Sequence, residues 1–241
     1  MDSDNNNAVK IISSWYDEES MISTEFRRLY SKLRHLNPGK DVKNLLITSA
    51  TLGEGKSTTA ALLAITIAKY RDTHTLLIDC DLRRPKIHKL FGMEKENGVV
   101  DVLLKTKPLK SVLKETFIPK LKVLTSGELT QRPAEVFNLP TIKELFAECK
   151  FYFDAIVIDT APTIPVSDTL ILSSETDGAL VVVRAGKTPR EMVKRAVDQM
   201  RDVGINMLGV VLNNASEVLP YYYNYHRDYY QYAKPDRGKY K

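Results

Sequence analysis

The sequence predicts an α/β fold, doubly wound, with a mostly parallel sheet and helices on both faces. Three observations lead to this prediction. Short segments that are apolar along their whole length recur through the chain, and helical stretches separate them. The chain has 241 residues, of which 43% are hydrophobic and 27% charged, as in an ordinary globular protein. We therefore expect alternating strands and helices in one domain.

The N-terminal part is expected to hold one helix. Residues 1–14 are polar and rich in asparagine, and we expect them to be flexible. Ser20 or Ser23 can cap the helix that follows, and Asn37-Pro38-Gly39 ends it. Its apolar positions recur at helical spacing: Ile22, Phe26, Leu29, Leu33 and Leu36.

Strands and helices alternate in the rest of the predicted domain, which spans residues 15–213. Six segments are predicted strands: 45–48, 75–78, 121–124, 155–158, 179–183 and 208–212. A helix rich in alanine and leucine is expected over Lys56–Tyr70, and a crossover helix over Pro189–Val203 joins the last two strands. Residues 86–150 are mostly helical by pattern and are expected to form an insertion around strand 121–124.

Several functional classes are disfavoured by composition. No run of 18 apolar residues exists and the N-terminus lacks a signal-peptide core, so we expect a cytoplasmic protein. Cys80 and Cys149 are too few for a disulfide framework and form no CxxC pair. The net charge of +5 is mild and does not by itself indicate nucleic-acid binding.

Residues 214–241 form a tyrosine-rich tail that we expect to be disordered. The tail shows no apolar periodicity and contains Pro220 and Pro235. It holds eight of the 12 tyrosines: Tyr221, Tyr222, Tyr223, Tyr225, Tyr229, Tyr230, Tyr232 and Tyr240. Its net charge is +2, from five basic and three acidic residues, and phosphorylation of several tyrosines would reverse that sign.

A phosphate-binding loop is predicted between the first strand and the first long helix. The segment ATLGEGKS matches the P-loop pattern except that Ala50 replaces the first glycine. Gly53 and Gly55 allow backbone N–H groups to turn towards phosphate oxygens, and the helix N-terminus adds partial positive charge. Lys56 is expected to reach the β- and γ-phosphates, and Ser57 to offer its hydroxyl to Mg²⁺.

Three carboxylates are predicted to lie at the same edge of the sheet as this loop. Asp79 and Asp81 follow strand 75–78, and Asp159 follows strand 155–158. Parallel strands end at one edge, so these groups and Lys56 should converge on one triphosphate. An aspartate after an apolar strand is the expected Mg²⁺ holder in P-loop enzymes. The residues alone leave open whether Asp79 or Asp81 takes a proton from an attacking hydroxyl.

Three segments carry a resemblance to a known family. The segment IDCDLRRP, from Ile78 to Pro85, resembles the second Walker motif of the bacterial tyrosine kinases (BY-kinases) of capsule and exopolysaccharide synthesis, the CpsD/CapB family. Residues 49–58 and 156–162 are similar to the first and third motifs, and the tail resembles the family's autophosphorylation cluster. The likeness runs from about Thr24 to the C-terminus and implies a MinD/ParA-like P-loop NTPase fold.

The resemblance implies an ATP- and Mg²⁺-dependent tyrosine autokinase. It implies nucleotide contacts from Gly53, Glu54, Gly55, Lys56, Ser57, Thr58 and Asn213, although Asn213 reads almost as well as a plain turn residue. It implies Mg²⁺ contacts from Ser57, Asp81 and Asp159, and catalytic roles for Lys56, Asp79 as the base, Asp81 and Arg83. The implied acceptors are Tyr221, Tyr222, Tyr223, Tyr225, Tyr229, Tyr230 and Tyr232.

The resemblance also implies partners and a location. These are further copies of the chain, such as a ring, a membrane-embedded activator or polysaccharide co-polymerase, and a cognate phosphotyrosine phosphatase. The chain would then lie at the inner face of the cell membrane through its partner. The family's Glu-x-x-Arg-x-x-Arg pattern is matched here only at Arg27, or in a shifted register at Glu25 and Arg28.

Other functions of the same fold remain as alternatives. A MinD/ParA-like ATPase that positions cargo is the first, but that group carries a lysine where this chain has Thr51 and Leu52. An iron–sulfur carrier would need paired cysteines. A nucleic-acid-binding module is unsupported, because the tail combines aromatic and basic residues without a known binding fold.

Overall fold

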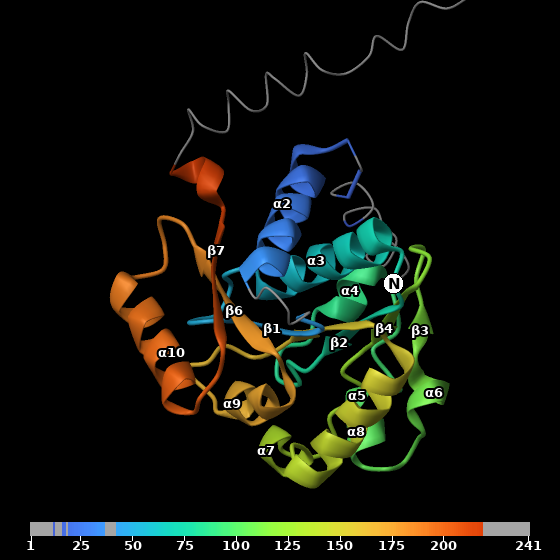
Figure 1. Cartoon of the computed structure of the whole chain (residues 1–241). Coiled ribbons are helices and arrows are strands. Elements are labelled where there is room, and N and C mark those ends of the chain that lie inside the picture. The colour runs from blue at the N-terminus through green and yellow to red at the C-terminus, as the bar shows by residue number, and fades with distance from the viewer. Residues whose placement is uncertain (1–11, 13–15, 18, 37–41, 219–241) are drawn as a thin grey trace, which may run out of the picture.

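The computed structural model describes residues 12, 16–17, 19–36 and 42–218. Within them a seven-stranded sheet has the order β3-β4-β2-β5-β1-β6-β7. Every neighbouring pair is parallel except β3 and β4. Helices cover both faces of the sheet, as Figure 1 shows. The predicted doubly wound α/β fold is confirmed.

The six predicted strands are all present, and each of their bounds lies within one residue of the prediction. The strands are β1 Asn44–Ser49, β2 Thr75–Asp79, β3 Lys114–Glu115, β4 Leu121–Leu124, β5 Ala155–Asp159, β6 Gly178–Arg184 and β7 Met207–Asn213. The sequence did not indicate β3, because two charged residues carry no apolar pattern. It pairs antiparallel with β4 at the edge of the sheet.

The predicted helices are present too. The longer ones are α2 Met21–Leu36, α3 Lys56–Arg71, α8 Leu139–Tyr152 and α10 Arg190–Asp202. The shorter ones are α4 Ile87–Phe91, α5 Val99–Leu103, α6 Leu109–Val112, α7 Pro133–Val136, α9 Asp168–Leu172, η1 Ser173–Glu175 and η2 Ala215–Glu217. Helices α4 to α7 and most of α8 lie in the predicted insertion, which also carries β3 and β4.

Ser20 is the residue that caps α2. Its Oγ accepts a hydrogen bond of 3.1 Å from the backbone N–H of Ser23, three residues into the helix. On the exposed side of α2, Arg28 pairs with Glu25 at 2.7 Å. Arg27 donates to Thr24 Oγ1 at 2.9 Å. Both predicted alignments of the Glu-x-x-Arg-x-x-Arg pattern therefore involve arginines that pair within the helix. The predicted stop at 37–39 lies outside the described residues.

Two hydrophobic cores form, one on each face of the sheet. Helices α2, α3 and α4 pack on one face, and α5, α8, α9 and α10 on the other (Figure 1). Helix α3 is buried almost all round, because α2 covers the side that faces away from the sheet. Ile12 lies in the stretch predicted to be flexible, and it is fully buried in the first of these cores.

No helix among the described residues is long and apolar enough to cross a membrane. The predicted tail begins at residue 214, and the structure describes its first residues, which include η2. Residues 219–241, with all the predicted acceptor tyrosines, lie outside the described part of the chain.

Candidate active site

The P-loop connects β1 to α3 and depends on its two glycines. Gly53 and Gly55 have φ angles of +77° and +93°, a region that disfavours side chains. A Cβ on Gly55 would also lie 2.0 Å from Nδ2 of Asn213. Gly55 is the N-cap of α3, so the first N–H groups of the helix face the loop. The loop therefore offers backbone donors to an anion such as a phosphate.

Asn213, at the end of β7, lies directly on this loop. Its Nδ2 donates a hydrogen bond of 2.9 Å to the carbonyl oxygen of Glu54. Asn213 is a predicted nucleotide contact, and this hydrogen bond shows that it also holds the P-loop against the end of β7. This contact is why Gly55 has no room for a side chain.

Lys56 is buried and forms an ion pair with Asp81. Its Nζ lies 2.7 Å from Oδ2 of Asp81, and both side chains are nearly inaccessible to solvent. Burial by itself lowers the pKa of Lys56, but Asp159, Asp81 and Asp79 together raise it above its ordinary value. Lys56 is therefore a cation held among three carboxylates, as the strand-end rule predicts.

Asp159, at the end of β5, is the least satisfied of these carboxylates. It is fully buried, and neither side-chain oxygen receives a well-formed hydrogen bond within the described chain. Burial raises the pKa of Asp159 to about 7, although the charge of Lys56 and the nearby Ser57 hydroxyl act to lower it. A buried carboxylate without donors fits a cation, and oxygen ligands of this kind suit Mg²⁺.

This arrangement fits Mg²⁺ bound together with a nucleotide. Among the described residues, no group of three or more acidic, histidine or cysteine side chains is arranged to hold a metal ion by itself. Mg²⁺ beside a nucleotide needs only one or two carboxylates, because phosphate oxygens and waters complete its shell. The oxygen ligands available to Mg²⁺ at this edge are those of Asp159, Asp81 and the Ser57 hydroxyl.

Asp79 has a structural role that the sequence did not reveal. Its Oδ2 accepts hydrogen bonds from the N–H groups of Lys86 and Ile87, at 3.1 and 3.0 Å. Its Oδ1 accepts one from Asp81 N–H at 3.3 Å. Burial, and then the neighbouring Asp159, raise the pKa of Asp79 well above its ordinary value. The carboxylate thus fixes the segment between β2 and α4, which carries Asp81.

Arg83 is anchored by Asp168, which no sequence pattern predicted. Its Nε donates to Oδ2 of Asp168 at 2.9 Å, and its Nη2 lies 3.5 Å from Oδ1. Asp168 begins α9 and is buried. The guanidinium is therefore held by a two-point contact between the β2–α4 segment and α9. Its predicted catalytic role stays a prediction.

Glu54 points its carboxylate back into the protein. The side chain is 2% exposed, and its oxygens accept hydrogen bonds from Thr51 N–H at 3.1 Å and Thr51 Oγ1 at 2.9 Å. A third donor is Thr188 Oγ1, at 2.6 Å. Thr188 lies between β6 and α10 and was not predicted, because no local pattern links positions so far apart.

A pocket of about 540 Å³ adjoins the P-loop helix. It lies between α2, the start of α3 and the end of β7. The predicted nucleotide contacts Thr58 and Asn213 line it, together with Phe26 and Ala215. Thr58 follows the P-loop directly in the sequence, and Asn213 bonds to Glu54 of the loop, so the pocket lies beside the phosphate loop.

A P-loop at the start of α3, with aspartates at the ends of β2 and β5, defines a P-loop nucleotide-binding protein. A family model described as "ParA: NUBPL iron-transfer P-loop NTPase" matches residues 41–231. Tyrosine-protein kinase YwqD of Bacillus subtilis is 34% identical over 197 residues, which cover 82% of this chain and 83% of that protein. Tyrosine-protein kinase CpsD of Streptococcus agalactiae is 36% identical over 202 residues, or 83% of this chain and 86% of that protein.

Solved structures point to the same family. The chimerical protein CapA2B2 has a TM-score of 0.79 and 30% identity, and the match covers 86% of this chain and 89% of that one. The kinase domain of Escherichia coli tyrosine kinase ETK has a TM-score of 0.76 and 28% identity, over 80% of this chain and 75% of that one. The chain belongs to the bacterial tyrosine-protein kinases, within the ParA-like P-loop NTPases, and the predicted family is confirmed.

The fold is shared more widely. MinD of Pyrococcus horikoshii, solved with Mg-ADP, has a TM-score of 0.61 and 19% identity, over 70% of this chain and 69% of that one. This weaker likeness supports the predicted MinD/ParA-like fold and carries nothing further about activity.

Proposed function

We propose that the chain is an ATP- and Mg²⁺-dependent protein-tyrosine kinase whose main substrate is its own tail. One observation carries the proposal most strongly. Lys56 lies among Asp79, Asp81 and Asp159 beside a P-loop, in a chain that belongs to the tyrosine-protein kinases. Phosphoryl transfer needs such groups, because catalysis is mainly positioning and neutralisation of charge.

Nucleotide binding would use the loop and Lys56 together. The backbone N–H groups around Gly53 and Gly55 would hold phosphate oxygens, and Lys56 would exchange Asp81 for a phosphate. Once Lys56 contacts a phosphate, the Asp81 carboxylate would be free to bind the Mg²⁺ that accompanies the nucleotide. Asp81, Asp159 and Ser57 would hold Mg²⁺, which when bound neutralises charge on the phosphates.

The tyrosine proton needs an acceptor, because the hydroxyl has a pKa of about 10. We assign this role to Asp79, as the family resemblance implies, because it is one of the three carboxylates that act on Lys56. Its three backbone donors fix its position during the transfer. Arg83 would stabilise charge on the transferred group, with Asp168 holding its guanidinium in place.

The tail starts at the edge of the sheet that carries the site. Residues 219–241 follow η2, and fully extended they would span about 75 Å at about 3.3 Å per residue. Acceptor tyrosines can therefore reach the site of the same chain or of a neighbour. Of the described tyrosines, Tyr16 and Tyr30 are buried, whereas Tyr70 and Tyr152 are exposed.

The wider role that we propose is regulation of capsule or exopolysaccharide synthesis and export. The chain would act with a membrane-embedded activator, at the inner face of the cell membrane, and in an assembly of several copies. The likeness to the CapA2B2 chimera supports the proposal of a partner protein. A cognate phosphatase would reverse the modification.

The MinD/ParA-like alternative is less well supported. The kinase structures share 30% and 28% identity with this chain, against 19% for MinD. The description of the family model names iron transfer, for which paired thiols would be expected. Cys80 and Cys149 are both buried and free, and they form no such pair.

The test is incubation of the purified chain with ATP and Mg²⁺, followed by detection and mapping of phosphotyrosine by antibody and mass spectrometry. Most phosphotyrosine should lie between Tyr221 and Tyr232. A variant with phenylalanine at these positions should lose the signal and still bind ATP. ATP hydrolysis without phosphotyrosine would instead support the cargo-positioning ATPase.

A further inference from the structure

A second groove, of about 550 Å³, lies between the edge strand β7 and helix α10. Its floor is formed by Val183, Val210 and Leu212, with Val193 of α10 along one side. Val210 and Leu212 are exposed by 52% and 49%, because β7 ends the sheet and no further element covers them within the described chain. The floor is therefore apolar and accessible.

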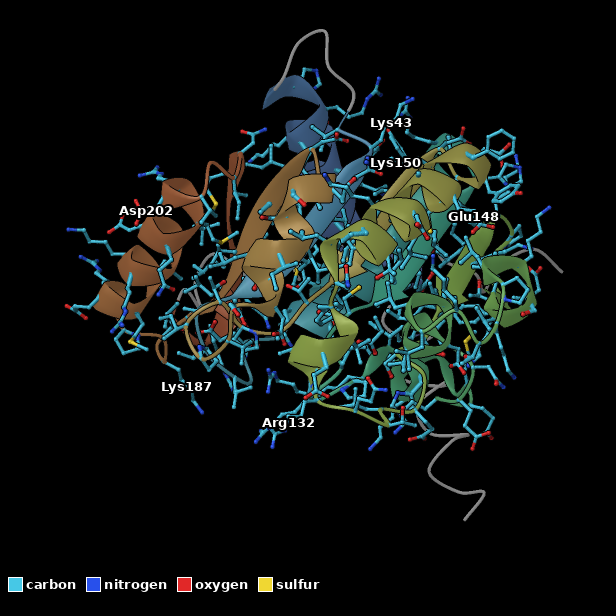
Figure 2. The ribbon with its side chains drawn as sticks, turned by 90° about the horizontal axis from the view of Figure 1, so that it is seen from below. Lys43, Arg132, Glu148, Lys150, Lys187 and Asp202 are labelled. Carbon is cyan, nitrogen blue, oxygen red and sulfur yellow. The ribbon has the colours of Figure 1, made fainter. Side chains whose placement is uncertain are left out.

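The rim of the same groove is basic. Arg184, Arg190 and Lys194 line it, and no acidic side chain does among the described residues. Lys187, on the turn between β6 and α10, projects outward nearby (Figure 2). A groove with an apolar floor and a cationic rim suits a ligand that combines a ring with negative charge.

The chain itself leads into this groove. Val218, the last described residue, is one of its lining residues. A side chain Cβ at Gly186 would lie 3.1 Å from Cγ1 of Val218, so the chain passes over the β6–α10 turn at this point. Tyr221 follows three residues later, within about 10 Å of extended chain.

The charge of the tail decides when it can bind there. Residues 219–241 hold Arg227, Lys234, Arg237, Lys239 and Lys241 against Asp228 and Asp236, a net charge of +3. An unmodified tail is therefore repelled by a basic rim. Each phosphotyrosine adds about −1.5 to −2, so two of them bring the tail to neutral or negative charge.

We propose that this groove binds the phosphorylated tail of the same chain, with phosphotyrosine rings on Val210 and Leu212 and phosphate oxygens on Arg190 and Lys194. The proposal rests on tail phosphorylation, which is the proposed function. Covalent attachment at Val218 favours the chain's own tail over a neighbour's, because a short connection gives a local concentration of about millimolar. Docking would withdraw a modified tail from the phosphoryl-transfer site.

The test uses the full-length Lys56→Met chain, whose tail stays unmodified, and a labelled synthetic peptide of residues 219–232. The peptide carries phosphate at Tyr221 and Tyr223, or none, and binding is followed by fluorescence anisotropy. The phosphopeptide should bind, and the double variant Arg190→Ala/Lys194→Ala should weaken it at least about tenfold, because contacts to charged groups are lost. Leu212→Ser should weaken it as well.

The matched control is Arg195→Ala/Arg201→Ala, which removes two charges from the same helix outside the groove lining. Equal weakening by both double variants, or equal binding of the unphosphorylated peptide, would overturn the proposal. So would self-association of the unmodified chain that Leu212→Ser abolishes, since a second copy would then be the occupant.

Attachment is tested on the wild-type chain. After treatment with ATP and Mg²⁺ it should bind the phosphopeptide more weakly than before, because its own tail fills the groove. If a fully phosphorylated chain binds the phosphopeptide with unchanged affinity, the docking proposal is wrong, whereas the proposed kinase function is not contradicted. A chain that binds the phosphopeptide but forms no phosphotyrosine contradicts only the proposed kinase function.

Discussion

The hydroxyl of Thr188 donates a hydrogen bond of 2.6 Å to the buried carboxylate of Glu54, and so ties the β6–α10 turn to the P-loop. The backbone N–H of Arg184 in turn donates to Thr188 Oγ1 at 3.0 Å, which fixes the threonine. Glu54 shares its other hydrogen bonds with Thr51 of the same loop. The shape of the phosphate site therefore depends on a turn that takes no direct part in the chemistry.

Thr188→Val should weaken ATP binding several-fold, up to about tenfold, because a buried carboxylate loses a donor. Thr188→Ser keeps the hydroxyl and should bind ATP as the wild type does. Titration with a fluorescent ATP analogue measures both, and thermal melting shows whether the fold is intact. Equal affinity of the valine and serine variants would show that the contact does not shape the loop.

Lys56→Met should lower autophosphorylation by at least about 100-fold, because it removes a charge that stabilises the transferring group. The fold should persist. The melting temperature near neutral pH should fall, since Asp81 loses its buried ion pair. Phosphotyrosine blotting and thermal melting are the measurements. A variant with wild-type phosphotyrosine would place the chemistry elsewhere.

The pH dependence of stability should report on Asp159. Burial raises its pKa to about 7 from an ordinary 3.8, so the folded protein holds this proton more tightly than the unfolded chain. Its stabilising contribution is complete below about pH 4 and is lost as the pH rises towards 7. Asp159→Asn cannot ionise, so it should reduce the slope of the unfolding free energy against pH between these values, while Asp79, whose pKa is also raised, still contributes.

Mg²⁺ and the proton should compete at the same group. Nucleotide-linked Mg²⁺ binding should weaken in the wild type as the pH falls below about 7. Asp81→Ala and Asp159→Ala should lower kinase activity in a way that excess Mg²⁺ rescues poorly. Denaturant melts and Mg²⁺ titrations over this pH range are the measurements. If the unfolding free energy of the Asp159→Asn chain varied with pH as steeply as that of the wild type, the raised pKa of Asp159 would be contradicted.

Transfer should occur mainly between subunits, because a tail that enters its own site must reverse direction at once. A mixture tests this. The Lys56→Met chain supplies an intact tail, and an otherwise intact chain with phenylalanine at Tyr221–Tyr232 supplies the active site. Phosphotyrosine should appear on the Lys56→Met chain. Silence in the mixture, while the wild type is active at the same concentration, would indicate transfer within one chain.

The sequence by itself determined most of the elements and predicted the main groups of the candidate site. Apolar runs identify six of the seven strands in the described part of the chain, because burial on both faces leaves a local pattern. The P-loop glycines and Lys56 are recognisable because phosphate binding needs these residue types at close spacing. Asp81 and Asp159 follow from one further rule, that parallel strands end at the same edge.

Only the tertiary structure decided which distant side chains meet. Thr188 with Glu54, Asp168 with Arg83, and Asn213 with the carbonyl of Glu54 join segments that no local pattern relates. The two-residue strand β3 is likewise defined by its partner and not by its own charged residues. A hydrogen bond needs its atoms within about 3 Å, and that proximity depends on strand order and packing, which a local pattern does not carry.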